Sequence, residues 1–85
     1  MAKYKIEIKR SAVKEIRKLP ILELKKVLAK IESLEDDPRP HDCIRLSGDE
    51  KYRVRVGDYR ILYMTEDLVC VVYIIKVGHR REVYR

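Results

Sequence analysis

The sequence predicts an α+β fold, in which a two-helix hairpin covers one face of a mainly antiparallel sheet of about four to five strands. Three features of the chain lead to this prediction. Polar and apolar residues alternate over residues 3–9, as in a strand with one solvated face. Two segments with helical spacing of apolar residues follow between residues 11 and 34. From residue 44 onward, alternating or apolar segments are joined by short turns, which indicates a set of strands that pair with one another.

The two helices are expected directly after the first strand. Ser11 is a residue that favours a helix N-cap, and apolar residues continue at helical spacing to Leu19. Pro20 then ends the first helix, because proline cannot donate the next hydrogen bond. A second helix, with one apolar stripe, is expected from Ile21 to the acidic and proline-containing segment at residues 36–40. Both helices therefore present an apolar side that a sheet would cover.

The remaining strands are predicted from alternation and from turn residues. They are a short strand around Ile44 and Leu46 and longer strands at residues 52–56, 59–64 and 68–77. Turns are expected at residues 47–50 and 65–67. Gly57 and Asp58 are expected to form a two-residue type II′ turn, which takes glycine at its first central position. The segment 68–77 is apolar on both faces, so it is expected to be a central, covered strand.

The Gly57–Asp58 turn also fixes how its two strands pair. A two-residue loop places Arg55 directly opposite Arg60. Directly opposed side chains share a face of the sheet, and so do alternate residues of one strand. Arg53, Arg55 and Arg60 are therefore expected together on the solvated face, with apolar residues on the face toward the helices. A bulge at Gly57 would turn Arg53 and Arg55 to the other face.

Three arginines on one face indicate a site for an anion. Like charges directly opposite each other destabilise a hairpin, and the hairpin offers no acid between them. The planar guanidinium group binds phosphate through two parallel hydrogen bonds. The alternative is three arginines that are only solvated, which explains one arginine easily and the opposed pair poorly. We therefore predict that this face binds phosphate.

The length and charge of the chain agree with one basic domain. Its 85 residues are enough for a single domain, residues 1–85, and too few for a second core. Hydrophobic residues make up 46%, which excludes a disordered protein. Lys and Arg total 20 against 14 acids, so the net charge is +6. Such a charge favours nucleic acid or an acidic protein as partner, although a merely solvated basic surface would also account for it.

Several other classes of protein are not expected. The longest apolar run, residues 68–75, is shorter than the ~20 residues that cross a bilayer. The first residues are charged and lack the apolar core of a secretory signal. Cys43 and Cys70 are too few for a zinc site, and Cys70 is expected to be a buried thiol. We therefore expect a cytoplasmic protein without membrane contact, metal or cofactor.

The C-terminal segment after Gly78 carries further candidate site residues. They are His79, Arg80, Arg81, Tyr84 and Arg85. Arg80 and Tyr84 are candidates for the same face as the hairpin arginines, where a tyrosine would offer a stacking surface for a base. A frayed basic end is an equal alternative. His79 is a candidate proton carrier because its unperturbed pKa lies near 7, whereas His41 is expected at the surface.

Two motifs resemble the RelE branch of the RelE/ParE toxin superfamily. One is the hairpin YRVRVGDYRILY at residues 52–63, preceded by LSG at residues 46–48, and the other is the tail VGHRREVYR at residues 77–85. The order of elements is also similar, so the resemblance covers essentially the whole chain. It implies the RelE-like fold and a toxin of a type II toxin–antitoxin pair. Such a toxin enters the ribosomal A site and cuts mRNA there without a metal, with the 2′-hydroxyl of a nucleotide attacking its own 3′ phosphodiester.

The resemblance also implies roles for individual residues. Arg60 and Arg80 would bind the phosphate and its transition state, and Tyr84 would stack on or orient the substrate. Arg53 and Arg55 would bind the mRNA backbone, and Arg55 is also counted among the catalytic candidates. Arg81 and Arg85 would add charge for RNA binding. The best-known members have lysines at the positions of Arg53 and Arg55. Because arginine does not lose its proton, His79 is the expected substitute as proton carrier.

The partners implied by the resemblance are a cognate antitoxin and the ribosomal A site with its mRNA. An antitoxin segment that binds a +6 domain is expected to be acidic and apolar. Three alternatives remain at this point. They are a ParE-like inhibitor of DNA gyrase on the same fold, an RNA-binding module without chemistry, and an inactive relative that only binds its antitoxin.

Overall fold

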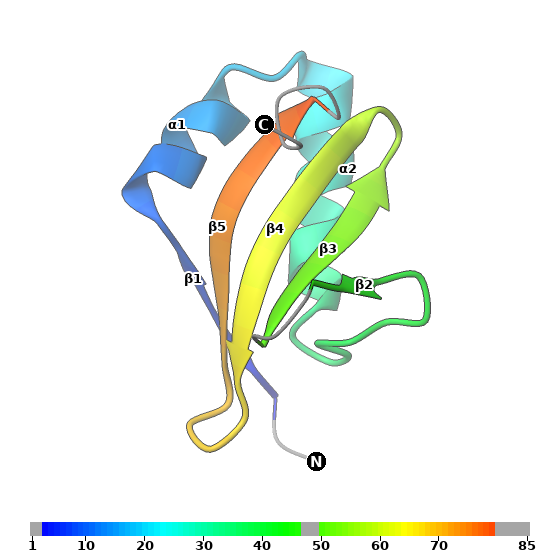
Figure 1. The fold of residues 1–85 in the computed structure, drawn as a ribbon. Coiled ribbons are helices and arrows are strands. Elements are labelled where there is room, and N and C mark those ends of the chain that lie inside the picture. Colours follow the sequence, from blue (N-terminus) through cyan, green and yellow to red (C-terminus); the bar gives the residue numbers. More distant parts are fainter. Residues whose placement is uncertain (1–2, 47–49, 80–85) are drawn as a thin grey trace.

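The described chain forms one five-stranded sheet with helices packed on one of its faces (Figure 1). The structure, a computed structural model, describes residues 3–46 and 50–79. The elements are β1 (Lys5–Ile8), α1 (Arg10–Arg17), α2 (Ile21–Ser33), β2 (Ile44–Arg45), β3 (Lys51–Val56), β4 (Tyr59–Glu66) and β5 (Val71–His79). The strand order is β1-β5-β4-β3-β2, in which only the β1–β5 pair is parallel. The predicted α+β class and the order of its elements are confirmed.

The first helix begins two residues before the predicted start. α1 begins at Arg10, and Lys9 occupies the N-cap position without a side-chain cap, so the assignment of Ser11 as N-cap is wrong. The N–H of Lys9 donates to the carbonyl of Ile74 (2.9 Å). The chain therefore passes from the sheet into α1 without a connecting loop. Pro20 separates the two helices as predicted and is the N-cap of α2, where proline is tolerated.

The strand predicted at residues 68–77 begins later in the structure. Residues 67–70 form the turn between β4 and β5, and the N–H of Cys70 donates to the carbonyl of Asp67 (3.2 Å). Leu68 is fully exposed, and Cys70 is half-buried rather than buried. Side chains from other elements fix Asp67, as described below, and this sets the turn within the apolar run. β5 lies inside the sheet between β1 and β4, whereas the middle strand is β4.

The hairpin of β3 and β4 has the predicted register. Arg55 pairs with Arg60, and Arg53 pairs with Leu62. Gly57 has a φ of +59°, and the next residue of the turn keeps a negative φ, as a type II′ turn requires. The short turn therefore determines which side chains of the hairpin share a face.

One extra residue, Ile75, interrupts the regular pairing of β5 with β4. Tyr63 pairs with Ile74 and Leu62 pairs with Lys76, so Ile75 has no opposite residue on β4. A bulge of this kind shifts the alternation of side chains by one position. Val77 is consequently buried in the core, and His79 points to the same face as Val77.

The core lies between the helices and one face of the sheet. Its buried side chains are Ala12, Ile16, Val27, Ile31, Leu34, Tyr52, Val54, Ile61, Tyr63, Val72, Ile74 and Val77. In Figure 1, α2 lies behind β3 and β4, and α1 lies beside β5. The opposite face of β3 and β4 is not covered by these helices, which leaves it available for a binding site.

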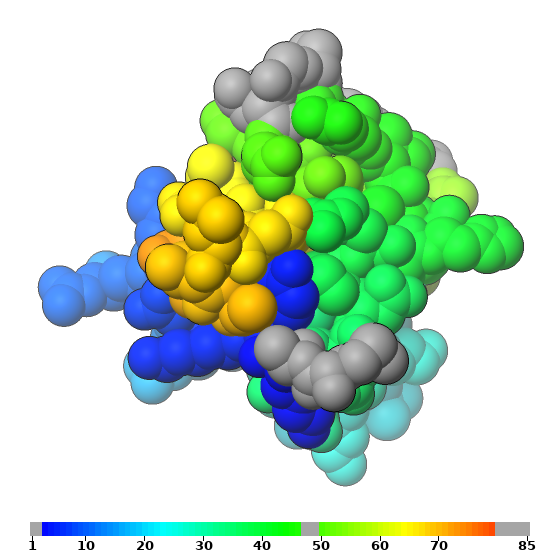
Figure 2. Space-filling model, turned by 90° about the horizontal axis from the view of Figure 1, so that it is seen from below, coloured from blue at the N-terminus to red at the C-terminus, as the bar shows by residue number. Residues whose placement is uncertain are grey.

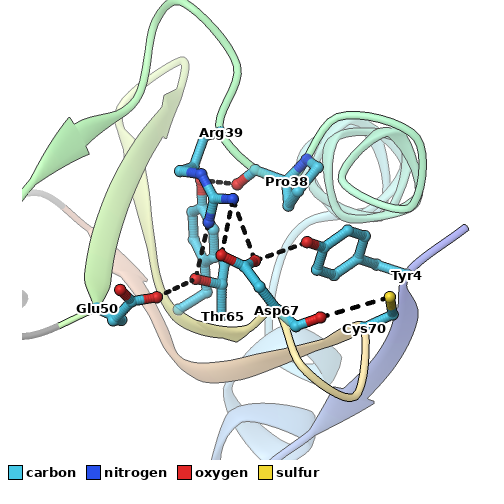
Figure 3. Close-up of polar contacts among 8 residues, drawn as sticks. Tyr4, Pro38, Arg39, Glu50, Thr65, Asp67 and Cys70 are labelled. Carbon is cyan, nitrogen blue, oxygen red and sulfur yellow. Dashed lines mark hydrogen bonds and ion pairs between the residues drawn. The ribbon is translucent and has the colours of Figure 1, made fainter. Parts of the chain in front are cut away.

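A polar cluster fixes the loop that joins α2 to β2 (Figure 3). Arg39 donates to the hydroxyl of Thr65 (3.0 Å) and to both carboxylate oxygens of Asp67 (3.1 and 3.0 Å). The hydroxyl of Tyr4 donates to the same carboxylate (2.6 Å). The start of the chain, the α2–β2 loop and the β4–β5 turn therefore lie side by side at this end of the molecule (Figure 2).

Candidate functional site

A cavity of about 420 Å³ lies on the face of β3 and β4 that the helices leave uncovered. Its lining residues are Asp42, Ile44, Arg53, Arg55 and Arg60. The three hairpin arginines are thus brought together, as the register predicts. Two further lining residues come from the loop before β2 and from β2 itself.

The pairing of strands explains why the arginines converge. Arg55 and Arg60 occupy directly opposed positions, and Arg53 lies two residues along β3 on the same face. On the other side of Arg60, β5 contributes Gly78, which has no side chain. Arg60 therefore lies between an arginine and a residue without a side chain.

The three arginines differ in exposure, which the sequence did not predict. Arg55 is exposed and Arg53 is half-buried, but the exposed fraction of Arg60 is only 7%. The expectation that all three lie on a solvated face is therefore wrong for Arg60, whose Nε and Nη1 atoms are buried. Arginine stays protonated even when buried. Arg60 thus supplies a permanent positive charge in surroundings that screen charge less than water does.

An acid also lies at the cavity, contrary to the expectation from the hairpin alone. Asp42 comes from the loop between α2 and β2, and both of its carboxylate oxygens accept from the amine of Lys30 on α2 (3.1 and 2.9 Å). The hydrogen bond from Lys30 lowers the pKa of the Asp42 carboxyl. Nothing in the sequence pattern shows which residues of this loop approach the hairpin, so Asp42 was missed.

His79 lies on the other face of the sheet from the arginines. Its ring packs edge-on against Tyr59, with 5.8 Å between ring centres. It lines a separate cavity of about 340 Å³ with Glu15 and Lys18 on the side of α1. The bulge at Ile75 accounts for this placement, because it reverses the alternation of β5 before its last residues. The structure therefore does not bring His79 together with the hairpin arginines.

The other candidates of the tail lie outside the described residues. They are Arg80, Arg81, Tyr84 and Arg85. Within residues 3–46 and 50–79, no cluster of three or more histidine, cysteine or acidic side chains is placed to hold a metal ion. Neither helix of this part of the chain is long and apolar enough to cross a membrane.

Comparison with known proteins identifies relatives over nearly the whole chain. The family model described as ParE toxin of type II toxin-antitoxin system, parDE, matches residues 6–84. A curated protein of Methanocaldococcus jannaschii, named "Putative toxin RelE1", is 36% identical over 87 residues. This match covers 98% of the present chain and 97% of the relative.

Solved structures of RelE toxins share the fold. The toxin in the RelE–RelB complex of Pyrococcus horikoshii superimposes with a TM-score of 0.84 at 32% identity, covering 92% of this chain and 96% of that one. The isolated RelE toxin of E. coli gives a TM-score of 0.81 at 28% identity, covering 95% and 90%. The chain from the RelBE2 complex of Mycobacterium tuberculosis gives 0.81 at 27% identity, covering 92% and 99%.

Proposed function

The chain belongs to the RelE/ParE superfamily and is a type II toxin of the RelE kind, and from this premise we propose that it is a ribosome-dependent endoribonuclease that cleaves mRNA in the ribosomal A site. The observation that carries the proposal is the cavity lined by Arg53, Arg55 and Arg60. A family member that acts on RNA needs a site for a phosphodiester, and this cavity offers three guanidinium groups on one face of the sheet. On this proposal the protein acts in the cytoplasm.

In the proposed reaction the 2′-oxygen bonds to the neighbouring phosphorus and passes its proton to water. The bond from phosphorus to the 5′-oxygen breaks, and the 5′-oxygen takes a proton from water, which leaves a 2′,3′-cyclic phosphate and a new 5′-hydroxyl. Negative charge accumulates on the phosphate oxygens as the new bond forms. The buried guanidinium of Arg60 stabilises this charge, and Arg55 lies directly opposite it on the hairpin. One such preorganised donor is worth about 10²–10³ in rate. Arg53 binds the backbone beside the reacting phosphate.

Proton transfer contributes little within the described site. Arginine does not act as a base, and His79 lies on the opposite face, so the proposal assigns it no proton transfer. Arg80 and Tyr84 remain proposed site residues on the strength of the family resemblance. Catalysis then depends on holding the 2′-hydroxyl in line with the phosphate, which requires a rigid substrate. A bent and immobilised mRNA in the A site meets this requirement, and unstructured RNA in solution does not.

The proposal is tested by incubating the purified protein with ribosomes that carry a short mRNA and an empty A site. We expect rapid cleavage of this mRNA and negligible cleavage of the same RNA without ribosomes. An mRNA with 2′-deoxyribose at the cut site should stay intact. Efficient multiple-turnover cleavage of ribosome-free RNA, or cleavage of the 2′-deoxy substrate, would contradict the mechanism. Intact mRNA together with inhibition of DNA gyrase would favour the ParE-like alternative.

We also propose that a cognate antitoxin binds the toxin through an acidic and apolar segment. The relative from Pyrococcus horikoshii was solved as a RelE–RelB complex. In the present chain, α2 exposes Ile21 (61%) and Leu22 (67%) beside the exposed lysines Lys25 and Lys26. Apolar contacts flanked by positive charge are complementary to such a segment.

A further inference from the structure

Lys30 and Asp42 form an ion pair beside the arginine cavity that the proposed reaction does not use. The amine of Lys30 contacts both carboxylate oxygens of Asp42, at 3.1 and 2.9 Å. The lysine is largely buried, with 24% of its side chain exposed, and the aspartate is half exposed, at 51%. Lys30 belongs to α2, whereas Asp42 belongs to the wall of the cavity. The pair therefore ties the wall of the cavity to the helical layer.

The position of Asp42 presents a problem for phosphate binding. An ionised carboxylate matches the fork of a guanidinium group as well as a phosphate does. If it paired with Arg53 or Arg55, it would occupy the donors and cancel the charge that a phosphate requires. The hydrogen bond from Lys30 lowers the pKa of the Asp42 carboxyl, so the group is ionised at neutral pH. Within the described residues, however, its ion-pair partner is Lys30, and no ion pair joins it to an arginine of the cavity.

We propose that Lys30 is a positioning residue that holds the carboxylate of Asp42 toward α2 and thereby keeps the arginine cavity available to a phosphate. The inference rests on the phosphate site of the proposed function. It adds that a residue of the helical layer affects phosphate binding at that site. Both oxygens of Asp42 accept hydrogen bonds from the amine of Lys30, which holds the carboxylate to α2. The titratable and charged groups around Asp42 are Lys30 from α2, the neighbouring His41 and the arginines of β3 and β4 that line the same cavity.

The proposal is tested by a double-mutant cycle on the whole chain. The readout is the affinity for a fluorescent single-stranded DNA oligonucleotide, which presents phosphates and lacks the 2′-hydroxyl needed for cleavage. Lys30→Ala should weaken binding about fivefold, the order expected for one partly exposed ion pair. Asp42→Asn and the Lys30→Ala/Asp42→Asn double variant should each bind within about twofold of the unchanged protein, because neither retains a carboxylate that competes for the arginines.

Two further variants separate positioning from charge and from stability. Lys30→Arg should restore binding, because it can still hold the carboxylate. Lys14→Ala removes one exposed lysine from the other helix, α1, and should change the affinity less than Lys30→Ala does. The melting temperature of each variant reports folding. If Lys30→Ala fails to fold, Lys30→Gln, which keeps most of the stem, takes its place in the cycle.

The outcomes distinguish this inference from the proposed function. A double variant that binds as weakly as Lys30→Ala would overturn the inference, since Lys30 would then act through its own charge. Unchanged binding of a folded Lys30→Ala would overturn it too, as would the absence of any binding by the unchanged protein. If the cycle behaves as expected and ribosome-bound mRNA is not cut, the inference stands and the proposed reaction is wrong.

Discussion

Arg60 differs from the other arginines of the cavity because it is a buried charge opposite a second arginine. The exposed fraction of Arg60 is 7%, whereas Arg55 is exposed at the surface. Burial reduces screening by water, so the charge of Arg60 acts more strongly on a bound phosphate than an exposed charge does. The two residues should therefore contribute differently to activity and to stability.

The first prediction concerns activity. Arg60→Ala should slow cleavage of ribosome-bound mRNA about 10²–10³-fold, because it removes a preorganised donor to the transition state. Arg60→Lys keeps the charge but loses the planar guanidinium group, so its rate should lie between those of the unchanged protein and Arg60→Ala. Arg17→Ala, at an exposed position of α1, is the control and should cleave at the unchanged rate. Single-turnover rates at saturating protein measure the effect. An Arg60→Ala variant that is folded and fully active would remove Arg60 from the site.

The second prediction concerns the repulsion between the opposed arginines. Arg55→Ala should stabilise the protein by up to about 1 kcal/mol, because like charges directly opposite each other destabilise a hairpin. For a domain of this size, that amounts to a rise of a few degrees in Tm. Arg53→Ala is the matched control, since Arg53 lies opposite Leu62 rather than a cation. Thermal unfolding at low salt measures both variants. A lower Tm for Arg55→Ala than for Arg53→Ala would contradict the argument.

At the scale of elements, the hairpin could be predicted and its surroundings could not. A two-residue turn fixes the register of adjacent strands, so the shared face of Arg53, Arg55 and Arg60 followed from local sequence. The burial of Arg60 on the face opposite the helices did not follow from the local pattern. The approach of Asp42 to the cavity depends on where the α2–β2 loop is fixed.

The bulge in β5 is another feature that the local sequence did not reveal. Apolar residues continue through the bulge, so the alternation gives no sign that Ile75 is an extra residue. The bulge nevertheless decides that His79 packs on Tyr59. The turn between β4 and β5 was predicted too early, at residues 65–67 instead of 67–70, because Leu68 is apolar yet fully exposed. Long-range contacts of Asp67, rather than local preference, fix that turn.

The third prediction concerns these contacts of Asp67. Hydrogen bonds from Tyr4 and from Arg39 lower the pKa of the Asp67 carboxyl. A lowered pKa in the folded state means that the ionised form stabilises the fold. This stabilisation is fully present above the ordinary pKa of aspartate, near 4, and is lost as the pH falls through the lowered value. Asp67→Asn should therefore unfold at lower denaturant than the unchanged protein at pH 7, and the difference should shrink as the pH falls below 4.

The control for this prediction is a carboxylate outside the cluster. Asp37 is exposed and forms no side-chain ion pair with the described residues. Asp37→Asn should leave the denaturation midpoint nearly unchanged at both pH values. Urea unfolding at pH 7 and at about pH 2.5, below the ordinary pKa of aspartate, measures the two variants. If the difference between Asp67→Asn and the unchanged protein grew in acid, the carboxylate would not be the stabilising form.

At the scale of the whole molecule, two different surfaces serve the two proposed partners. The uncovered face of β3 and β4 carries the arginine cavity. The helical side exposes apolar residues of α2 beside lysines, and the net charge of the chain is +6. Composition alone indicated a polyanionic partner. The register of the hairpin already predicted the arginine face, and the fold adds the second surface, the exposed apolar residues and lysines of α2.

The last prediction is that charge and apolar contact on α2 affect different steps of antitoxin binding. Exposed charges steer the encounter of two proteins, so Lys25→Glu should lower the association rate constant and make it less dependent on salt. Apolar contacts form after the encounter, so Leu22→Ala should mainly raise the dissociation rate constant, consistent with its 67% exposure in the unbound toxin. Lys5→Glu, on an exposed position of β1, makes the same change of charge away from α2 and serves as the control. Surface-immobilised antitoxin and stopped flow at 50 and 300 mM salt measure both constants. If Lys5→Glu and Lys25→Glu lower the association rate equally, net charge rather than the surface of α2 steers the antitoxin. If Leu22→Ala leaves dissociation unchanged, the antitoxin binds elsewhere.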